Sequence, residues 1–188
     1  MSAAEPELGV RSSEVDTDEF RAAMGSFAAG VTVITTLDAS GAPQALTATA
    51  FSSVSLSPPL CLVCVARRTR AHQPLLNRGH FAVNILRAEQ QWLSARFASS
   101  AADRFAAVAW QPGSVAGCPI LDDALVVMEC RVVEVHAGGD HDIILGSPLW
   151  LRVREGAPLV YWRGNYSSLP PPPQVEVGSS NEAAQARH

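Results

Sequence analysis

The sequence contains no lysine, so its 14 basic residues other than histidine are all arginines, and 18 acidic residues outnumber them. The net charge is −4 and the pI is near 5.7. The densest basic cluster is Arg67-Arg68-Thr69-Arg70. Because binding to a nucleic acid needs many positive charges along one surface, a nucleic-acid partner is not expected. The cluster suits one small anion, or else it is a solvated loop.

The sequence also lacks an apolar stretch long enough to cross a membrane, and its first residues are polar and acidic, unlike a secretory signal. We therefore expect a cytoplasmic protein that does not bind a membrane. Cysteines are few: Cys61, Cys64, Cys118 and Cys130. The first two fall in an apolar run that predicts a strand, where residues three apart point to opposite faces. We expect buried thiols and no metal site.

The usual nucleotide-binding signatures are absent, since neither GxGxxG nor GxxxxGK[ST] occurs and strands do not alternate with helices as a Rossmann fold requires. Apolar and β-branched runs predict strands at 31–36, 44–53, 60–66, 81–86, 124–136, 142–154 and 159–162. A short helix or turn is predicted at 70–77. A helix is predicted at 89–97, with Trp92, Leu93 and Phe97 on one side. The pattern indicates a mainly β barrel with a few short helices.

The ends of the chain differ from its middle in composition. Residues 1–15 predict a flexible arm, residues 16–168 one domain, and residues 169–188 a proline-rich and then polar tail. Asp16 is a candidate N-cap for a first helix, in which apolar residues at helical spacing predict a buried face. These residues are Phe20, Ala23, Met24 and Phe27. The stretch 99–121 predicts a long irregular loop, of a kind that often covers a ligand or an interface.

Two segments contain candidate functional residues. Gly138-Gly139-Asp140-His141-Asp142 predicts a tight turn that places a histidine, the side chain most easily tuned near neutral pH, at the start of a strand. Residues 47–57 include six threonines and serines, whose hydroxyls suit an anion such as phosphate together with nearby backbone N–H groups. Taken alone, the first segment also fits a solvated hairpin tip, and the second fits an ordinary polar strand and loop.

With four further stretches, these segments resemble the short-chain flavin reductase family, the split β-barrel reductase components of two-component flavin-dependent monooxygenases. The resemblance covers most of the chain between Asp16 and Ser168, in the family's order. It is carried by residues 20–36, the hydroxyl segment with Pro58-Pro59-Leu60, residues 79–86 and 93–98, Gly139-Asp140-His141, and residues 158–166. The fold that it implies is a mainly β, Greek-key-like split barrel.

The resemblance implies an NADH-dependent reductase, with NADPH the less favoured donor, that reduces free FAD or FMN and passes the reduced flavin to a separate oxygenase. A homodimer is expected from the long apolar-rich loop at 101–121 and from the interfacial site that the resemblance implies. Because the cofactors carry the electron chemistry, the protein's task is mainly to position them. His141 is implied to orient the nicotinamide, with Arg163 and Tyr166 near the same opening, and Arg96 is a weaker candidate. The residues implied to line the flavin and its phosphate are Thr47, Ala48, Thr49, Ala50, Ser52, Ser53, Cys64, Val65, Ala66, Arg67, Thr69 and Arg70.

Two departures from the family pattern affect the flavin. Thr49 and Ala50 stand where the family usually has Asn and Ser, and alanine cannot donate a side-chain hydrogen bond. The phosphate loop, usually serine-rich, is arginine-rich here. The added positive charge could favour FAD, but an arginine also holds the phosphate of FMN, so the identity of the flavin stays open.

Two other functions stay open on the residues alone. One is a non-catalytic flavin- or haem-binding barrel for storage or sensing, which would not need a histidine facing the nicotinamide. The other is a hydrolytic metal enzyme that uses His136, Asp140, His141 and Asp142. It is disfavoured because Asp140 and Asp142 should share one strand face while His141 points to the other.

Overall fold

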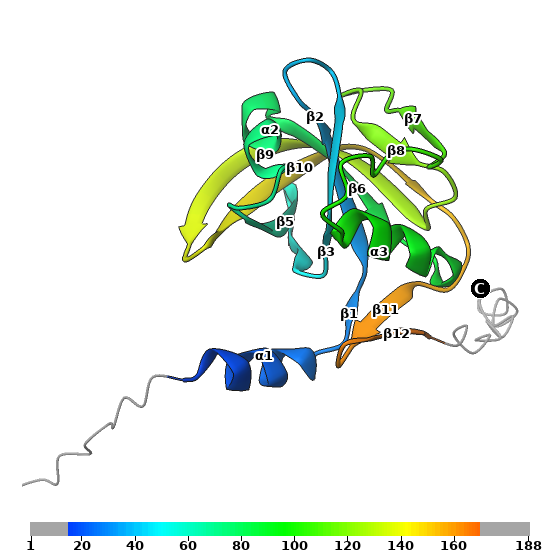
Figure 1. The fold of residues 1–188 in the computed structure, drawn as a ribbon. Helices are drawn as coiled ribbons and strands as arrows, with labels where there is room; N and C mark the ends of the chain where they lie inside the picture. The colour runs from blue at the N-terminus through cyan, green and yellow to red at the C-terminus, as the bar shows by residue number, and fades with distance from the viewer. Residues whose placement is uncertain (1–14, 170–188) are drawn as a thin grey trace, which may run out of the picture.

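A seven-stranded antiparallel sheet forms the centre of the structure, a computed structural model that describes residues 15–169 (Figure 1). The strand order is β3-β2-β6-β9-β10-β5-β4. These strands are β2 (Thr32–Leu37), β3 (Pro43–Ala48), β4 (Phe51–Leu56), β5 (Pro59–Ala66), β6 (His80–Ile85), β9 (Val126–Gly138) and β10 (His141–Val153). The prediction of a mainly β fold is confirmed.

The sheet curls into a barrel that is split between its first and last strands. β3 and β4 follow one another in the sequence, yet they form opposite edges of the sheet. The chain passes from one edge to the other at Thr49 and Ala50, and β4 then pairs with β5. The single strand predicted at 44–53 is therefore wrong. A run of small residues gives no local signal for a break that the closing of the barrel imposes.

The inward face of the barrel forms the main core, with Ile34, Val63, Phe81 and Ile144 fully buried. Along β5 the burial alternates, so that Cys61, Val63 and Val65 point inward while Leu62, Cys64 and Ala66 are half-buried on the other face. The prediction of buried thiols is confirmed for Cys61, Cys118 and Cys130 and is wrong for Cys64, which is half-buried. The prediction that Cys61 and Cys64 lie on opposite faces is confirmed.

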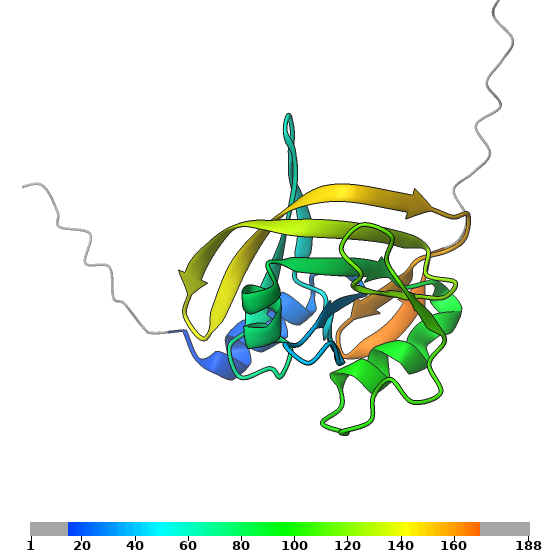
Figure 2. The ribbon, with the colours of Figure 1, turned by 90° about the horizontal axis from the view of Figure 1, so that it is seen from above.

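β9 and β10 form a long hairpin that arches over the barrel (Figure 2). Its turn is at Gly139 and Asp140, and Gly139 has a φ of 68°, a left-handed conformation that favours glycine. The predicted hairpin is confirmed. Gly146 in β10 lies directly against the ring of Phe81 in β6, because a Cβ atom at Gly146 would be 2.4 Å from Phe81 Cζ.

Two small sheets flank the barrel. β1 (Ala29–Gly30), β11 (Leu159–Trp162) and β12 (Asn165–Ser168) form one, in the order β1-β11-β12. β7 (Trp110–Pro112) and β8 (Pro119–Leu121) form the other. β12 is too polar to be predicted from apolar patterning. The stretch 99–121 is not wholly irregular, and Val108, Cys118 and Leu121 within it are buried against the barrel.

The helices are short: α1 (Thr17–Gly25), α2 (His72–Arg78) and α3 (Gln91–Ala98), with a 3₁₀ turn η1 (Ala88–Gln90) before α3. Asp16 caps α1 as predicted. The prediction that α1 buries one face is wrong in the single chain. No residue of α1 is buried, and Phe20 is 59% exposed. In α3, Leu93 and Phe97 are buried as predicted, but Trp92 is 53% exposed.

The predicted arm (1–15) and tail (169–188) fall almost wholly outside the described residues. Within residues 15–169, no helix is both long and apolar enough to cross a membrane.

Candidate active site

The break between β3 and β4 leaves backbone groups open. Thr49 and Ala50 are exposed, and in residues 15–169 neither backbone N–H donates to a backbone carbonyl. The carbonyl of Ala50 accepts from the Cys64 N–H at 3.0 Å, which fixes the break beside β5. Two free, exposed N–H groups on a fixed segment can bind an acceptor on a ligand without any side-chain donor.

His141 begins β10 immediately after the turn. It lies opposite Ala66 of β5, and Ile143, two residues further along β10, lies opposite Cys64. His141, Ala66 and Cys64 therefore share the half-buried face of neighbouring strands. The ladder β10–β5 and the Ala50–Cys64 bond place His141 and the open backbone at the same end of the barrel wall.

The ring of His141 is oriented by a carboxylate. Its Nδ1 lies 2.7 Å from Asp140 Oδ1, and this bond is the main reason why the pKa of Asp140 is lowered. An ionised carboxylate only accepts, so Nδ1 carries the proton and donates it. Nε2 then faces outward, because within the described residues it makes no hydrogen bond, and the side chain is 42% exposed. A ligand can therefore reach Nε2.

Asp142 lies in a different environment from Asp140. It is buried, accepts two hydrogen bonds from Arg67 at 2.9 and 2.6 Å, and contacts His72 Nε2 at 2.7 Å. The hydrogen bond from Arg67, followed by that of His72, lowers the pKa of Asp142. Two acids that were expected to share one face are therefore separated, because Asp140 belongs to the turn. In residues 15–169, no cluster of three metal-ligating side chains is formed.

The Arg67–Asp142 pair changes the expected role of Arg67. Its guanidinium is engaged by the protein, so it ties the loop after β5 to the strand that bears His141. The next residues of the loop, Arg68, Thr69 and Arg70, instead line a hollow of about 410 Å³. The hollow also includes Thr47 of β3 and Arg104 from the stretch that follows α3. Its remaining lining residues are Leu46, Phe97, Ala98, Ser99 and Ser100.

This hollow has the chemistry of an anion site. Its lining contains three arginines and no carboxylate, and within residues 15–169 none of the three forms an ion pair. The hydroxyl of Ser100 adds a further donor, whereas the hydroxyl of Ser99 donates to the Arg96 carbonyl at 2.8 Å. The residues present therefore fit a phosphate-bearing ligand such as a flavin nucleotide. Arg104 was not predicted, because no sequence signal links it to a loop more than thirty residues earlier.

Other predicted residues contribute differently. The side chains of Ala48 and Val65 are buried in the core, so only their backbones can meet a ligand. Ser52 and Ser53 are exposed on the edge strand β4. Thr47 donates to the carbonyl of Ser94 at 2.8 Å, and the Ser94 hydroxyl meets Tyr166 Oη at 2.9 Å. Tyr166 is thereby joined to the segment that leads into the break.

Two predicted arginines are engaged elsewhere. Arg163 lies in the turn between β11 and β12, with its guanidinium 4.9 Å from the centre of the Trp162 ring and near Ser26. Arg96 donates to the carbonyls of Arg104 at 2.6 Å and Asp103 at 2.9 Å. Its contacts hold the loop that bears Arg104, so Arg96 is neither a ligand contact nor a free surface arginine.

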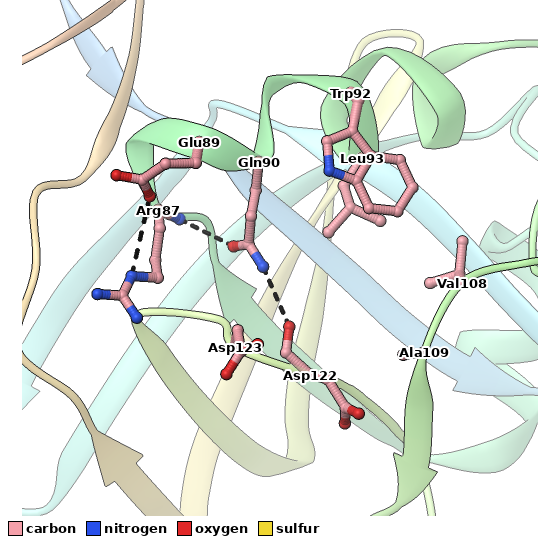
Figure 3. Close-up of a pocket in the computed structure, with 9 residues that line it drawn as sticks. All are labelled: Arg87, Glu89, Gln90, Trp92, Leu93, Val108, Ala109, Asp122 and Asp123. Carbon is pink, nitrogen blue, oxygen red and sulfur yellow. Dashed lines mark hydrogen bonds and ion pairs between the residues drawn. The ribbon is translucent and has the colours of Figure 1, made fainter.

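A separate hollow of about 490 Å³ contains none of the predicted residues (Figure 3). It lies between η1, α3 and the segment after β8. There Gln90 Oε1 accepts a hydrogen bond from the Arg87 backbone N–H at 3.0 Å, and Gln90 Nε2 donates to the Asp122 carbonyl at 3.0 Å (Figure 3). These bonds hold the 3₁₀ turn against the barrel, so the polar groups at this site serve the fold.

Comparison with known proteins agrees with this geometry. A family model described as "Flavin reductase like domain" matches residues 24–170. The chain is 45% identical to "Flavin reductase (NADH)" of Kitasatospora aureofaciens over 83% of both chains. It is 36% identical to "Flavin-dependent monooxygenase, reductase subunit HsaB" of Mycobacterium tuberculosis, over 85% of this chain and 86% of that one.

A solved structure gives the same result. The NADH:FAD oxidoreductase SgcE6 of Streptomyces globisporus, in complex with NAD and FAD fragments, superposes with a TM-score of 0.77 at 35% identity. The match covers 83% of this chain and 94% of that one. The predicted split barrel is thereby confirmed, and the chain belongs to the flavin reductase-like domain family.

Proposed function

We propose that this chain is an NADH-dependent flavin reductase that supplies reduced flavin to a separate monooxygenase. The observation that carries the proposal is the juxtaposition of three features at one end of the barrel wall. They are the open backbone at Thr49 and Ala50, the outward Nε2 of His141, and the arginine-lined hollow that begins two residues after Ala66. Together they can hold a planar ring, a second ring beside it, and a phosphate.

Each feature has a positioning task. The N–H groups of Thr49 and Ala50 bind the polar edge of the flavin ring, and the half-buried Cys64 and Ala66 offer an apolar surface beside it. Arg68, Thr69 and Arg70 lie toward the phosphate. His141, held by Asp140, orients the nicotinamide. NADH supplies the hydride and the flavin accepts it, so the chain's contribution is to bring the two rings into contact and to exclude water.

The flavin is a substrate that binds and leaves. The contacts offered to the flavin ring are backbone N–H groups, each worth about 1 kcal/mol, and the arginines at the phosphate lie in a hollow that is open to solvent exchange. The purified protein should therefore be pale and should lose residual flavin on dialysis. The four cysteines are free, as fits a reducing compartment such as the cytoplasm.

We also propose that the working unit is a homodimer. The long loop at 99–121 does not support this, because its apolar residues pack on their own barrel. The support comes from surfaces that one chain leaves uncovered. Phe20, Met24 and Phe27 are all more than half exposed, and Leu56 at the tip of the β4–β5 hairpin is 91% exposed. In Figure 1, α1 projects to one side of the barrel, to which β1 joins it.

One assay tests the catalytic proposal. Purified protein with NADH and either FAD, FMN or riboflavin should consume NADH at an ordinary enzymatic rate, on the order of 1–10³ per second. The rival function, a barrel that only stores or senses a flavin or haem, predicts tight binding of its ligand and no NADH consumption. Failure with all three flavins would exclude the reductase.

A further inference from the structure

Arg70 and Arg104 form the boundary between two hollows. One is the arginine-lined hollow of about 410 Å³ described above. The other, of about 330 Å³, is lined by Arg70 and Arg104 together with Ala42, Pro43, Gln44, Ala102, Asp103 and Phe105. We call it the outer hollow. A ligand that begins at the open backbone and passes through the first hollow would meet both guanidiniums before it reaches the outer hollow.

The two arginines line the same two hollows, and within residues 15–169 neither forms an ion pair. Arg104 donates one bond to the Phe97 carbonyl at 2.8 Å, and its remaining donors are not used within residues 15–169. Burial, followed by the positive charge of Arg70, lowers the pKa of Arg104. Two cations held close to one another in this way are stabilised by an anion placed between them.

The chemistry of the two hollows differs. The first contains three arginines and no acid, whereas the outer hollow adds Asp103, a glutamine and the Phe105 ring. A carboxylate disfavours a phosphate but tolerates a neutral base and ribose, and an aromatic ring can stack on a base. The arrangement runs from a phosphate region, across a pair of arginines, to a region suited to an uncharged nucleoside.

We propose that Arg70 and Arg104 bind the second phosphate of FAD, so that the adenosine occupies the outer hollow and the chain prefers FAD to FMN. This inference rests on the proposed function and adds the identity of the flavin. FMN would use the first hollow alone. The pyrophosphate of NADH has the same chemistry and could compete for this pair of arginines, so the experiment separates the two sources.

The test measures flavin binding without NADH, from the quenching of flavin fluorescence, for FAD, FMN and riboflavin. Wild-type protein should bind FAD at least tenfold more tightly than FMN. Arg70→Gln and Arg104→Gln should each weaken FAD binding by about tenfold and FMN binding by about threefold or less, because each removes a charge-assisted contact to phosphate. Riboflavin binding should not change. Arg131→Gln, an exposed arginine in β9, is the matched control.

A second variant acts by volume rather than by charge. Ala102→Trp fills the outer hollow and should weaken FAD binding while it leaves FMN binding unchanged. Equal affinities for FAD and FMN, or equal losses of both in every variant, would overturn the inference. Unchanged flavin affinities with a raised KM for NADH would assign the arginines to the dinucleotide donor instead. Reduction of riboflavin by all variants would show that the reductase itself is intact.

Discussion

At His141, one ring nitrogen is engaged by the protein and the other is left for a ligand. The bond from Nδ1 to Asp140 fixes the tautomer and the plane of the ring, as expected of a group that must hold a partner in one orientation. Hydride transfer between two stacked rings needs their atoms at near-contact distance and needs no proton relay. The role that follows for His141 is to orient the donor.

His141→Ala should therefore raise the KM for NADH and slow hydride transfer, with flavin affinity nearly unchanged. The expected loss in kcat/KM is about 1–3 kcal/mol, the value of one positioned polar contact. Stopped-flow measurement of the hydride step provides the readout. His136→Ala, a half-exposed histidine in the other strand of the same hairpin, is the control and should behave like wild type. If a folded His141→Ala protein kept wild-type NADH kinetics, His141 would be a solvated residue at the hairpin turn with no part in binding NADH.

Gly146 is a second position at which a single residue matters, because only glycine leaves room for the Phe81 ring. Its hydrogen atom faces the Phe81 ring, and an added methyl group would also lie 3.3 Å from Cys130 Cβ. Gly146→Ala should lower the free energy of unfolding by about 1–3 kcal/mol, because a packed core resists added volume. Urea unfolding at one fixed protein concentration measures this. Gly30→Ala, at a strand glycine with open space around it, should change little. Gly146→Ala with Phe81→Leu should recover part of the loss.

At the scale of elements, the Asp142 carboxylate joins three segments. It connects β10, the loop after β5 and the start of α2 through Arg67 and His72. Because the folded pKa of Asp142 lies below its unfolded value of about 3.9, the ionised group stabilises the native state at every pH above that value. This stabilisation is lost as the pH falls through the folded pKa.

Asp142→Asn should lower the urea midpoint at neutral pH, and the difference from wild type should shrink as the pH falls below about 4. Unfolding curves collected from neutral to acidic pH measure the difference. Asp123→Asn removes an exposed pair with Arg154 and should have little effect at any pH. A constant difference between Asp142→Asn and wild type across this range would contradict the assignment.

The elements also show which signals were local. The β9–β10 hairpin was predictable because a glycine pair lies between two apolar runs. The helix cap at Asp16 was predictable because an aspartate precedes apolar residues at helical spacing. The break at Thr49 and Ala50 was not, since only the closure of the barrel creates it. His141 could be identified from its turn. The roles of two other residues could not be identified in this way. Asp142 connects three segments and Arg104 lines the anion site, and both roles depend on contacts with distant segments that no local pattern encodes.

At the scale of the whole molecule, α1 is an element whose apolar side chains the chain leaves exposed. α1 has apolar residues at the spacing of a packed helix, yet no residue of the same chain buries them. A hollow beneath α1 is lined by Phe20, Met24 and Phe27 on one side, and by Thr49 and Tyr161 on the other. A second chain that covers α1 would therefore also lie beside the open backbone of the candidate site.

Light scattering should give twice the 19.9 kDa mass of one chain. Phe20→Asp with Phe27→Asp should shift the protein toward the monomer and reduce flavin affinity along with it, because charge on an apolar interface opposes association. Trp92→Asp, at an exposed aromatic residue on α3, should stay dimeric. A wild-type monomer at assay concentration, or a monomeric double variant with full flavin affinity, would contradict this arrangement.

The position of β3 and β4 at opposite edges of one sheet has a consequence for how fast the chain folds. Only neighbouring hairpins such as β9–β10 can form early, since Val33 pairs with Asn84, Phe81 with Cys130 and Val65 with Asp142. Each of these ladders closes a loop of about fifty residues or more before any of its contacts form. Refolding should therefore take milliseconds to seconds or longer. The open backbone at Thr49 and Ala50 exists only after the last edge is in place, so flavin binding should recover with the slowest refolding phase.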